Sequence, residues 1–279
     1  MAADHAGTVA LSGNGRAETG SCTNCGTPLS GRFCSRCGQE DRPLDPGVGE
    51  LVRELAQELS SLDSRVARSV RRLFFSPGFL TNEYWRGRRA AWVSPVRLYL
   101  IFSVAYFAIV SLTGQSPLSL NLRFTTSAGE DTSEAIQRLG FSSEEEMHHR
   151  VNQALESWIP RAMFVLVPLF AWMVSLVRRR SGRRYPQHLI FTLHLFAAFF
   201  GIQAVLAAAR PITGESGIAR VLGVTALVYV TGYAVLAMKA VYGGTIGRAL
   251  AHTVVVGIFY WIATIVAAAA ILVPLLWRS

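Results

Sequence analysis

HLIFTLHLFAAFFGIQAVLAAA, residues 188–209, contains no charged side chain and is apolar over almost its whole length. An α-helix needs about 20 such residues to cross the roughly 30 Å of hydrocarbon in a bilayer. We therefore predict that this stretch is a transmembrane helix. A fold built around such a helix needs further apolar segments to surround it.

Four further runs of similar composition lie on either side of this stretch. They are found near residues 96–112, 160–177, 218–238 and 250–277. Of the 279 residues, 51% are hydrophobic and only 16% are charged, so too little polar sequence remains to cover five buried helices of a water-soluble protein. The sequence thus predicts a mainly α fold, a polytopic helical membrane protein with about five transmembrane helices, in which the membrane domain covers residues 78–279.

Arginines are distributed unevenly between the connecting segments. Between Arg65 and Arg97 there are eight arginines and one acidic residue, Glu83. Residues 114–159 carry seven acidic residues against three arginines, and residues 178–187, RRRSGRRYPQ, carry five arginines and no acid. This alternation follows the positive-inside rule. The net charge of +9 is therefore attributed to membrane topology, and no nucleic-acid partner is expected.

The first 20 residues lack the basic start and the apolar core of a secretory signal. They are rich in Gly, Ala, Ser and Thr, and we expect residues 1–20 to be a disordered tail. Together with the arginine distribution, this predicts a multi-pass protein of the cytoplasmic (inner) membrane with a cytoplasmic N-terminus. Five spans then place the C-terminus outside.

All four cysteines of the chain lie in residues 21–40. They form two Cys-x2-Cys pairs, each followed directly by glycine: Cys22 and Cys25, then Cys34 and Cys37. Two residues between thiols let both reach one ion from a tight turn, so the two pairs predict a zinc ribbon with one tetrahedral structural Zn²⁺ site. Iron is a less favoured occupant, and disulfide or redox chemistry is disfavoured in a cytoplasmic segment. Four protein ligands leave no open position on the metal for catalysis.

Apolar residues recur at steps of three and four over the next segment, which predicts an amphipathic helix over residues 45–77. Its first half is acidic and its second half basic. Three roles are open for it: packing on the ends of the spans, contact with lipid headgroups, or self-association as a coiled coil.

The following stretch, residues 76–100, interleaves tryptophans and tyrosines with arginines, a composition typical of a membrane interface. Because guanidinium groups pair with phosphate oxygens, four arginines are candidates for headgroup or phosphate contact. They are Arg86, Arg88, Arg89 and Arg97. The alternative role of these arginines is topological anchoring.

Three motifs occur in order along the chain: FCSRCGQ at 33–39, FFSPGFLTNEYWRGRRAAWVSPVRLYLIFS at 74–103, and RRYPQHLIFTLHLFAAF at 183–199. In this combination the chain resembles an uncharacterised bacterial membrane family, catalogued as domain of unknown function 3667. The resemblance implies an architecture, a cytoplasmic zinc ribbon joined to a multi-span membrane domain. It brings no established activity with it.

Polar residues are sparse within the predicted spans. His194 lies about two turns inside the third span and is a candidate intramembrane polar site, either for an interhelical hydrogen bond or for proton or substrate handling. His188 is expected at the cytoplasmic surface. No span contains Asp or Glu, which disfavours an ion-coupled transporter. The chain also lacks the HExxH, GxSxG and GxxxxGK[ST] motifs, so an enzymatic role is disfavoured.

These observations favour a membrane-anchored adaptor or regulatory protein, in which the ribbon binds a cytoplasmic protein partner and the spans contact membrane lipid. The alternative is a transporter, channel or lipid-handling protein regulated by the ribbon. Small residues within the spans are compatible with a homo-oligomer.

Overall fold

The computed structural model describes residues 21–40, 65–115, 141–214 and 216–277, and within these ranges the regular secondary structure is helical. The described helices are α2 (Arg65–Phe75), α3 (Phe79–Trp85), α4 (Pro95–Leu112), α6 (Glu144–Val177), the short 3₁₀ turn η1 (Arg179–Ser181), α7 (Tyr185–Thr213), α8 (Gly217–Tyr242) and α9 (Ile246–Trp277). The predicted tail, residues 1–20, lies outside the described residues.

Five helices are long and apolar enough to cross a membrane. The segments are Pro95–Leu112, Ser157–Val177, Tyr185–Thr213, Gly217–Tyr242 and Ile246–Ala270. They confirm the predicted fold class, a helical membrane protein with five spans. The second span belongs to a longer helix than expected, because α6 continues without a break from the polar run that precedes it and contains Pro160 and Pro168 in its interior.

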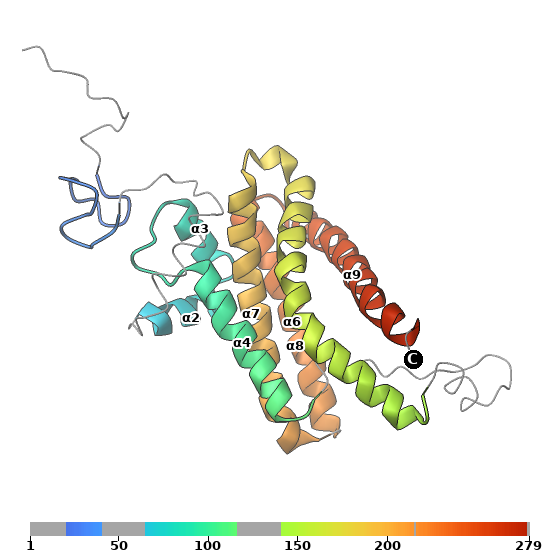
Figure 1. Ribbon diagram of the computed structural model, residues 1–279. Coiled ribbons are helices and arrows are strands. Elements are labelled where there is room, and N and C mark those ends of the chain that lie inside the picture. Colours follow the sequence, from blue (N-terminus) through green and yellow to red (C-terminus); the bar gives the residue numbers. More distant parts are fainter. Residues whose placement is uncertain (1–20, 41–64, 116–140, 215, 278–279) are drawn as a thin grey trace, which may run out of the picture.

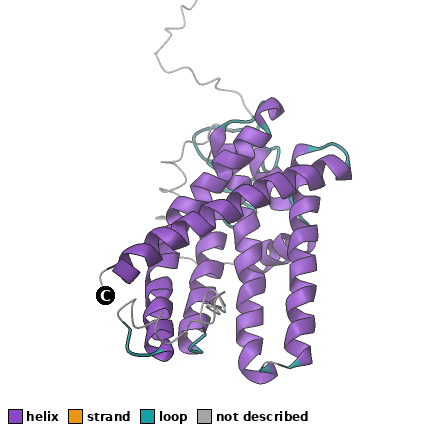
Figure 2. Cartoon of the chain, turned by 90° about the vertical axis from the view of Figure 1, so that its right-hand side faces the viewer, coloured by secondary structure: helices purple, strands orange, loops and turns teal. Residues whose placement is uncertain are grey.

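Helix α7 forms the centre of the bundle (Figure 1). It contacts α4, α6 and α8, and it also touches the short helices α2 and α3. Of the 18 most apolar consecutive residues in α7, 67% are buried, whereas 6% are buried in the corresponding stretch of α9. Helix α9 packs on α6 and α8 and runs obliquely across the other helices to the C-terminal end (Figure 2).

Small and aromatic residues allow α4 to lie close to α7. Phe200 of α7 is surrounded by Tyr99 and Phe107 of α4, with ring centroids 6.0 and 5.7 Å away. A Cβ on Gly201 would lie 2.3 Å from the ring of Phe74, in the last turn of α2. Glycine at position 201 is therefore required for this packing.

The amphipathic helix predicted over residues 45–77 is described only from Arg65 onward. Helix α2 ends at Phe75, and Gly78, with φ +78°, turns the chain into α3. Atoms of α8 lie 2.8–3.2 Å from where a Cβ of Gly78 would be, so a side chain there is excluded twice, by backbone conformation and by space. The described part of the helix thus packs on the bundle through Leu73, which is 1% exposed.

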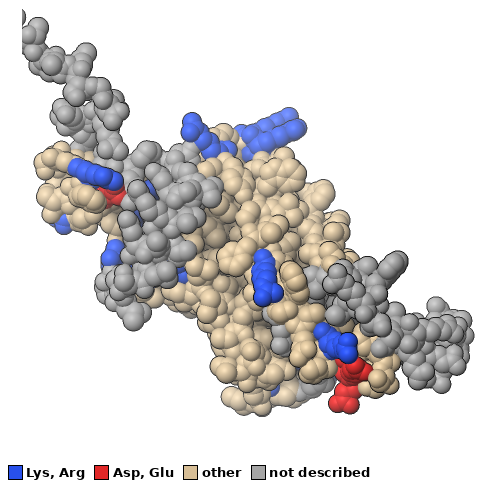
Figure 3. Space-filling view, in the orientation of Figure 1, with Lys and Arg blue, Asp and Glu red and all other residues tan. Residues whose placement is uncertain are grey.

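The bundle has two distinct ends. The near end carries residues 21–40, the loop between α3 and α4, the turn at η1 and the turn between α8 and α9 (Figure 1). The far end carries the end of α4 and the turn between α7 and α8. Basic side chains gather at the near end, and the middle of the bundle is mostly uncharged (Figure 3).

Candidate metal centre and its contact with the membrane domain

The four cysteine sulfurs converge in one place. Sγ of Cys22 lies 3.6 Å from Sγ of Cys37, Sγ of Cys25 lies 3.5 Å from Sγ of Cys34, and all four lie within 4.8 Å of one another. Four thiolates about 2.3 Å from one tetrahedral ion would be separated by about 3.8 Å. The donor set and its spacing therefore fit a single metal ion. The predicted ligands Cys22, Cys25, Cys34 and Cys37 are brought together as the sequence spacing required.

Each pair of cysteines sits on the same backbone turn, and the turn repeats after 12 residues. The amide N–H of Cys22 donates to Thr27 and that of Gly26 to Cys22; the amide N–H of Cys34 donates to Gln39 and that of Gly38 to Cys34, all at 2.8 Å. An isolated β-bridge closes each turn, between Ser21 and Pro28 and between Phe33 and Glu40. Residues 21–40, named here the cysteine module, thus consist of two nearly identical knuckles.

The two thiols of the first knuckle have different acidities. Burial raises the pKa of Cys22 to about 11. The hydroxyl of Thr27, 3.4 Å from Sγ of Cys25, stabilises the thiolate and lowers the pKa of Cys25 to about 6. Since a metal binds thiolates, an ion entering the site must displace a proton held tightly by Cys22.

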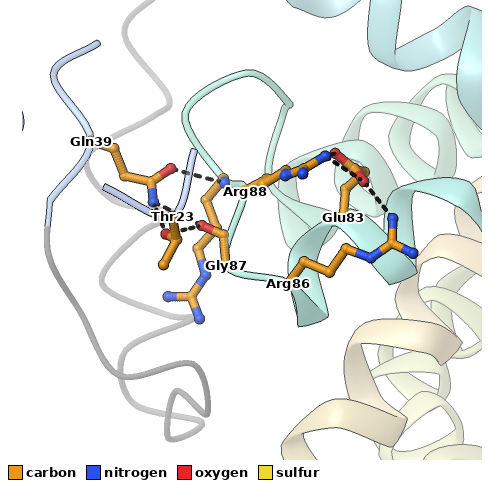
Figure 4. A network of polar contacts seen from close by, with 7 residues as sticks. Thr23, Gln39, Glu83, Arg86, Gly87 and Arg88 are labelled. Carbon is orange, nitrogen blue, oxygen red and sulfur yellow. Dashed lines mark hydrogen bonds and ion pairs between the residues drawn. The ribbon is translucent and has the colours of Figure 1, made fainter. Parts of the chain in front are cut away.

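The cysteine module is attached to the membrane domain by the side chain of Gln39 (Figure 4). Its Nε2 donates to the carbonyl of Gly87 at 2.8 Å and to the hydroxyl of Thr23 at 2.8 Å. Its Oε1 accepts from the amides of Arg89 and Ala90, both at 3.1 Å. Thr23 in turn donates to the carbonyl of Gly87 at 3.1 Å. This docking contact joins both knuckles to residues 86–94, named here the arginine loop.

Two of the four candidate headgroup arginines are tied to one carboxylate. Glu83 is 6% exposed at the end of α3, and its oxygens lie 3.1 Å from Arg86 and 3.4 Å from Arg88. The side chains of these arginines are 65% and 49% exposed, so each keeps part of its guanidinium in solvent. Ion pairing with Glu83 shapes the loop that receives the cysteine module.

The other two candidates lie nearby. Arg89 supplies a backbone amide to the docking contact, and Arg97 lies in the first turn of α4, where its amide donates to the capping hydroxyl of Ser94 at 3.4 Å. Three of the four arginines thus belong to the arginine loop, and Arg97 lies in the helix that follows it. Their contact with headgroups or phosphate stays a prediction.

Helix α3 connects the arginine loop to α7. Nε1 of Trp85 donates to the carbonyl of Gln187 at 3.3 Å, and the guanidinium of Arg183 lies 4.4 Å from the centroid of the Trp85 ring. Such a cation–π contact contributes about 0.5–1 kcal/mol at an exposed site. The arginine-rich turn before α7 is thereby packed against the helix that leads into the loop.

A second polar cluster lies at the near end between α6, α7, α8 and α9. His188, expected at the surface, is instead 1% exposed, and its Nδ1 lies 2.7 Å from the hydroxyl of Tyr242. Arg178 donates to the carbonyl of Tyr242 at 2.7 Å and lies 3.1 Å from Nδ1 of His252. The burial of His188 was not predicted, because its partner Tyr242 lies 54 residues away in the sequence.

His194 forms the interhelical hydrogen bond that was one of its two predicted roles. Its Nδ1 lies 3.1 Å from the hydroxyl of Thr81 in α3, and Tyr84 packs against it edge to face, with centroids 5.8 Å apart. Its Nε2 is buried without a hydrogen-bond partner among the described residues. The side chain is 3% exposed.

Two residues that organise this region were not singled out from sequence. Gln39 follows the second knuckle, and nothing in its neighbours indicates that it contacts the backbone 48 residues later. Glu83 did carry a signal, because it is the one acidic residue among eight arginines. An isolated acid in a basic segment is a good candidate for a buried ion pair.

Residues 63–107 match the model of a family described as "Protein of unknown function (DUF3667)". The matched segment contains α2, α3, the arginine loop and most of α4, and the four cysteines lie outside it. This match confirms the resemblance noted from the sequence motifs. No curated protein and no solved structure gives a match.

Proposed function

We propose that this chain is a membrane-anchored adaptor or regulatory protein of the cytoplasmic membrane, whose zinc-loaded cysteine module binds a cytoplasmic protein partner. The observation that carries the proposal is the division of the module into two kinds of surface. Thr23 and Gln39 hold it on the arginine loop, whereas Phe33 is 58% exposed. A large exposed aromatic side chain on a small module is a typical anchor of a protein interface.

Zinc is the proposed metal because the four sulfurs suit a closed tetrahedral site, and iron is the alternative that the same ligands accept. A segment as small as residues 21–40 lacks a hydrophobic core of its own. We therefore assign the metal a structural role, to fix the shape of the surface around Phe33. Metal analysis of the purified protein distinguishes the two ions.

The proposed topology places the near end in the cytoplasm. It is supported by the arginines that gather there, including those of the arginine loop and of the turn before α7 (Figure 3). The cysteine module then faces the cytoplasm, where thiols stay reduced. A homo-oligomer remains a further proposal, and no nucleic-acid partner is proposed.

The experiment replaces Phe33 with a photoreactive phenylalanine analogue and irradiates native membranes. The matched control carries the analogue at Ser21, which is the equivalent position in the first knuckle and is also exposed. We expect one protein to be crosslinked from position 33, not from position 21, and to be lost after metal chelation. Crosslinks only to lipid, or equal crosslinks from both positions, would contradict a partner-binding role for this surface.

Transport or lipid handling regulated by the module is the second candidate. The observation that favours it is the buried imidazole of His194 within a span, whose Nε2 has no hydrogen-bond partner in the part of the chain that the structure describes. His194→Ala should then lower flux or lipid movement in reconstituted vesicles, whereas the adaptor role predicts no change. A matched Thr81→Val variant removes the hydrogen bond to Nδ1 while keeping the imidazole.

A further inference from the structure

We propose that an anionic phospholipid binds at the far end of the bundle, with its headgroup at Arg210 and Arg220 and one acyl chain in an apolar cavity among the spans. This site lies at the end of the bundle opposite the cysteine module and is independent of the proposed partner-binding function.

The cavity that would hold the acyl chain has a volume of about 630 Å³. It is lined mainly by aromatic and aliphatic side chains of α6, α7, α8 and α9, among them Phe196, Leu227 and Tyr260. Leu227 and Trp261, which also lines it, are each 67% exposed, so the cavity opens on the outer surface of the bundle. Within spans, that surface faces lipid. The size is within the range of 300–1,000 Å³ that is typical of small-molecule sites.

A second cavity of about 470 Å³ adjoins the first at Tyr106 and Gln203, which line both. It extends toward the far end and has a more polar lining that includes Arg210 at the end of α7 and Arg220 in the first turns of α8. The two cavities together form a path that is apolar within the bundle and cationic at its mouth. This distribution is that of a phospholipid, with an apolar chain and an anionic head.

The two arginines are available for a ligand. Both are exposed, and neither side chain has a hydrogen bond or an ion pair within the described residues. Glu215 stands between them in the sequence and lies outside the described residues. Guanidinium groups pair bidentately with phosphate oxygens. Two of them at one cavity mouth favour a headgroup with a net negative charge over a zwitterionic one, in which an ammonium group offsets the charge of the phosphate.

Glycine positions allow the chain site to be filled without disturbing the fold. Gly257 lines the larger cavity, and a Cβ placed on it would meet no atom within 4 Å. Gly257→Leu should therefore occupy the path of the acyl chain. Gly232 on α8 is equally open but lines neither cavity, so Gly232→Leu is the matched control.

The test measures lipid binding to the purified full-length protein by native mass spectrometry, with phosphatidylglycerol and phosphatidylcholine as probes. We expect the double variant R210Q/R220Q to bind phosphatidylglycerol about 30-fold more weakly, at about tenfold per 1.4 kcal/mol and about 1 kcal/mol per arginine, with little change for phosphatidylcholine. Gly257→Leu should weaken the binding of both lipids, and Gly232→Leu of neither. The charge control is R179Q/R180Q at the near end, which should leave binding unchanged.

Three results would overturn the proposal. The first is equal loss of both lipids in R210Q/R220Q, and the second is no loss in Gly257→Leu, with thermal unfolding showing that each variant is folded. The third is binding of glycerol phosphate, which has no acyl chain, as tightly as phosphatidylglycerol. That result would assign the arginines to a water-soluble anion.

Discussion

Removing the side chain of Gln39 should release the cysteine module from the arginine loop. Gln39→Ala removes three hydrogen bonds to the arginine loop, one donated by Nε2 to the carbonyl of Gly87 and two accepted by a single Oε1. The fourth bond, from Nε2 to Thr23, lies inside the module and does not count toward docking. A neutral hydrogen bond contributes a net 0.5–1.5 kcal/mol, and the shared acceptor makes the three equivalent to about two. We expect the docked state to lose about 2 kcal/mol, which lowers the ratio of docked to released module about 30-fold.

Amide hydrogen exchange followed by mass spectrometry reads this change directly. The amides of Arg89 and Ala90 donate to Gln39 in the docked state, so a peptide covering residues 86–92 should exchange faster in Gln39→Ala. Gln115→Ala is a matched control, because Gln115 makes a similar contact with the carbonyl of Ala207 at the far end. Unchanged exchange of residues 86–92 in Gln39→Ala would refute the docking contact as a determinant of the loop's protection.

Metal removal should have the same effect on the wild-type protein. Gln39 follows Gly38 of the second knuckle directly, and its carbonyl accepts the amide N–H of Cys34 at 2.8 Å. Loss of the ion should loosen this turn and with it the position of the Gln39 side chain. If a chelator removes the metal and residues 86–92 remain protected, docking does not depend on the metal.

Three further predictions concern stability and metal content. Gly78→Ala should destabilise the protein by about 2–4 kcal/mol in thermal unfolding, and Gly114→Ala by about 1–2 kcal/mol. Both glycines have positive φ, but only Gly78 has atoms of α8 within 3.2 Å of its Cβ position. Equal losses of stability in the two variants would contradict the close packing at Gly78. The pKa of Glu146 is lowered because its carboxylate accepts the amide N–H of Ser142. This contact therefore stabilises the start of α6 at pH values above the ordinary pKa of about 4.5, and the stabilisation is lost as the pH falls through the lowered pKa. Amide exchange, corrected for intrinsic rates, should show that loss in the wild type and not in Glu146→Gln. Cys34→Ser should reduce the metal content from one ion per chain toward zero in elemental analysis, and full retention would exclude this sulfur as a ligand.

Properties that depend on residues close together in the sequence could be predicted. The five spans follow from hydropathy, because a bilayer requires long apolar helices whatever their neighbours are. The convergence of the four cysteines follows from two short spacings and the glycine after each pair. The amphipathic helix was predicted to end at residue 77, and α2 ends at Phe75.

Contacts between distant segments could not be predicted. Gln39 forms hydrogen bonds with backbone atoms of the arginine loop. Backbone N–H and C=O groups are the same in nearly every residue, so the sequence does not indicate which residues Gln39 contacts. His188 was placed at the surface because arginines precede it, whereas Tyr242 of α8 stacks on its ring and lies within hydrogen-bond distance of it. In both cases tertiary packing determined which residues came into contact, and the sequence around Gln39 or His188 contains little information about that packing.

The 12-residue repeat within the cysteine module means that its attachment is a choice between two orientations. Exchanging the knuckles would bring Ser35 to the position of Thr23 and Thr27 to the position of Gln39. Ser35 and Thr23 both carry a hydroxyl. Thr27, in contrast, is shorter than Gln39 and cannot reach the arginine loop, and its hydroxyl is already hydrogen-bonded to the sulfur of Cys25. The orientation of the attachment therefore depends on which of the two similar turns carries the glutamine, and transferring the glutamine from position 39 to position 27 should reverse the module on the arginine loop.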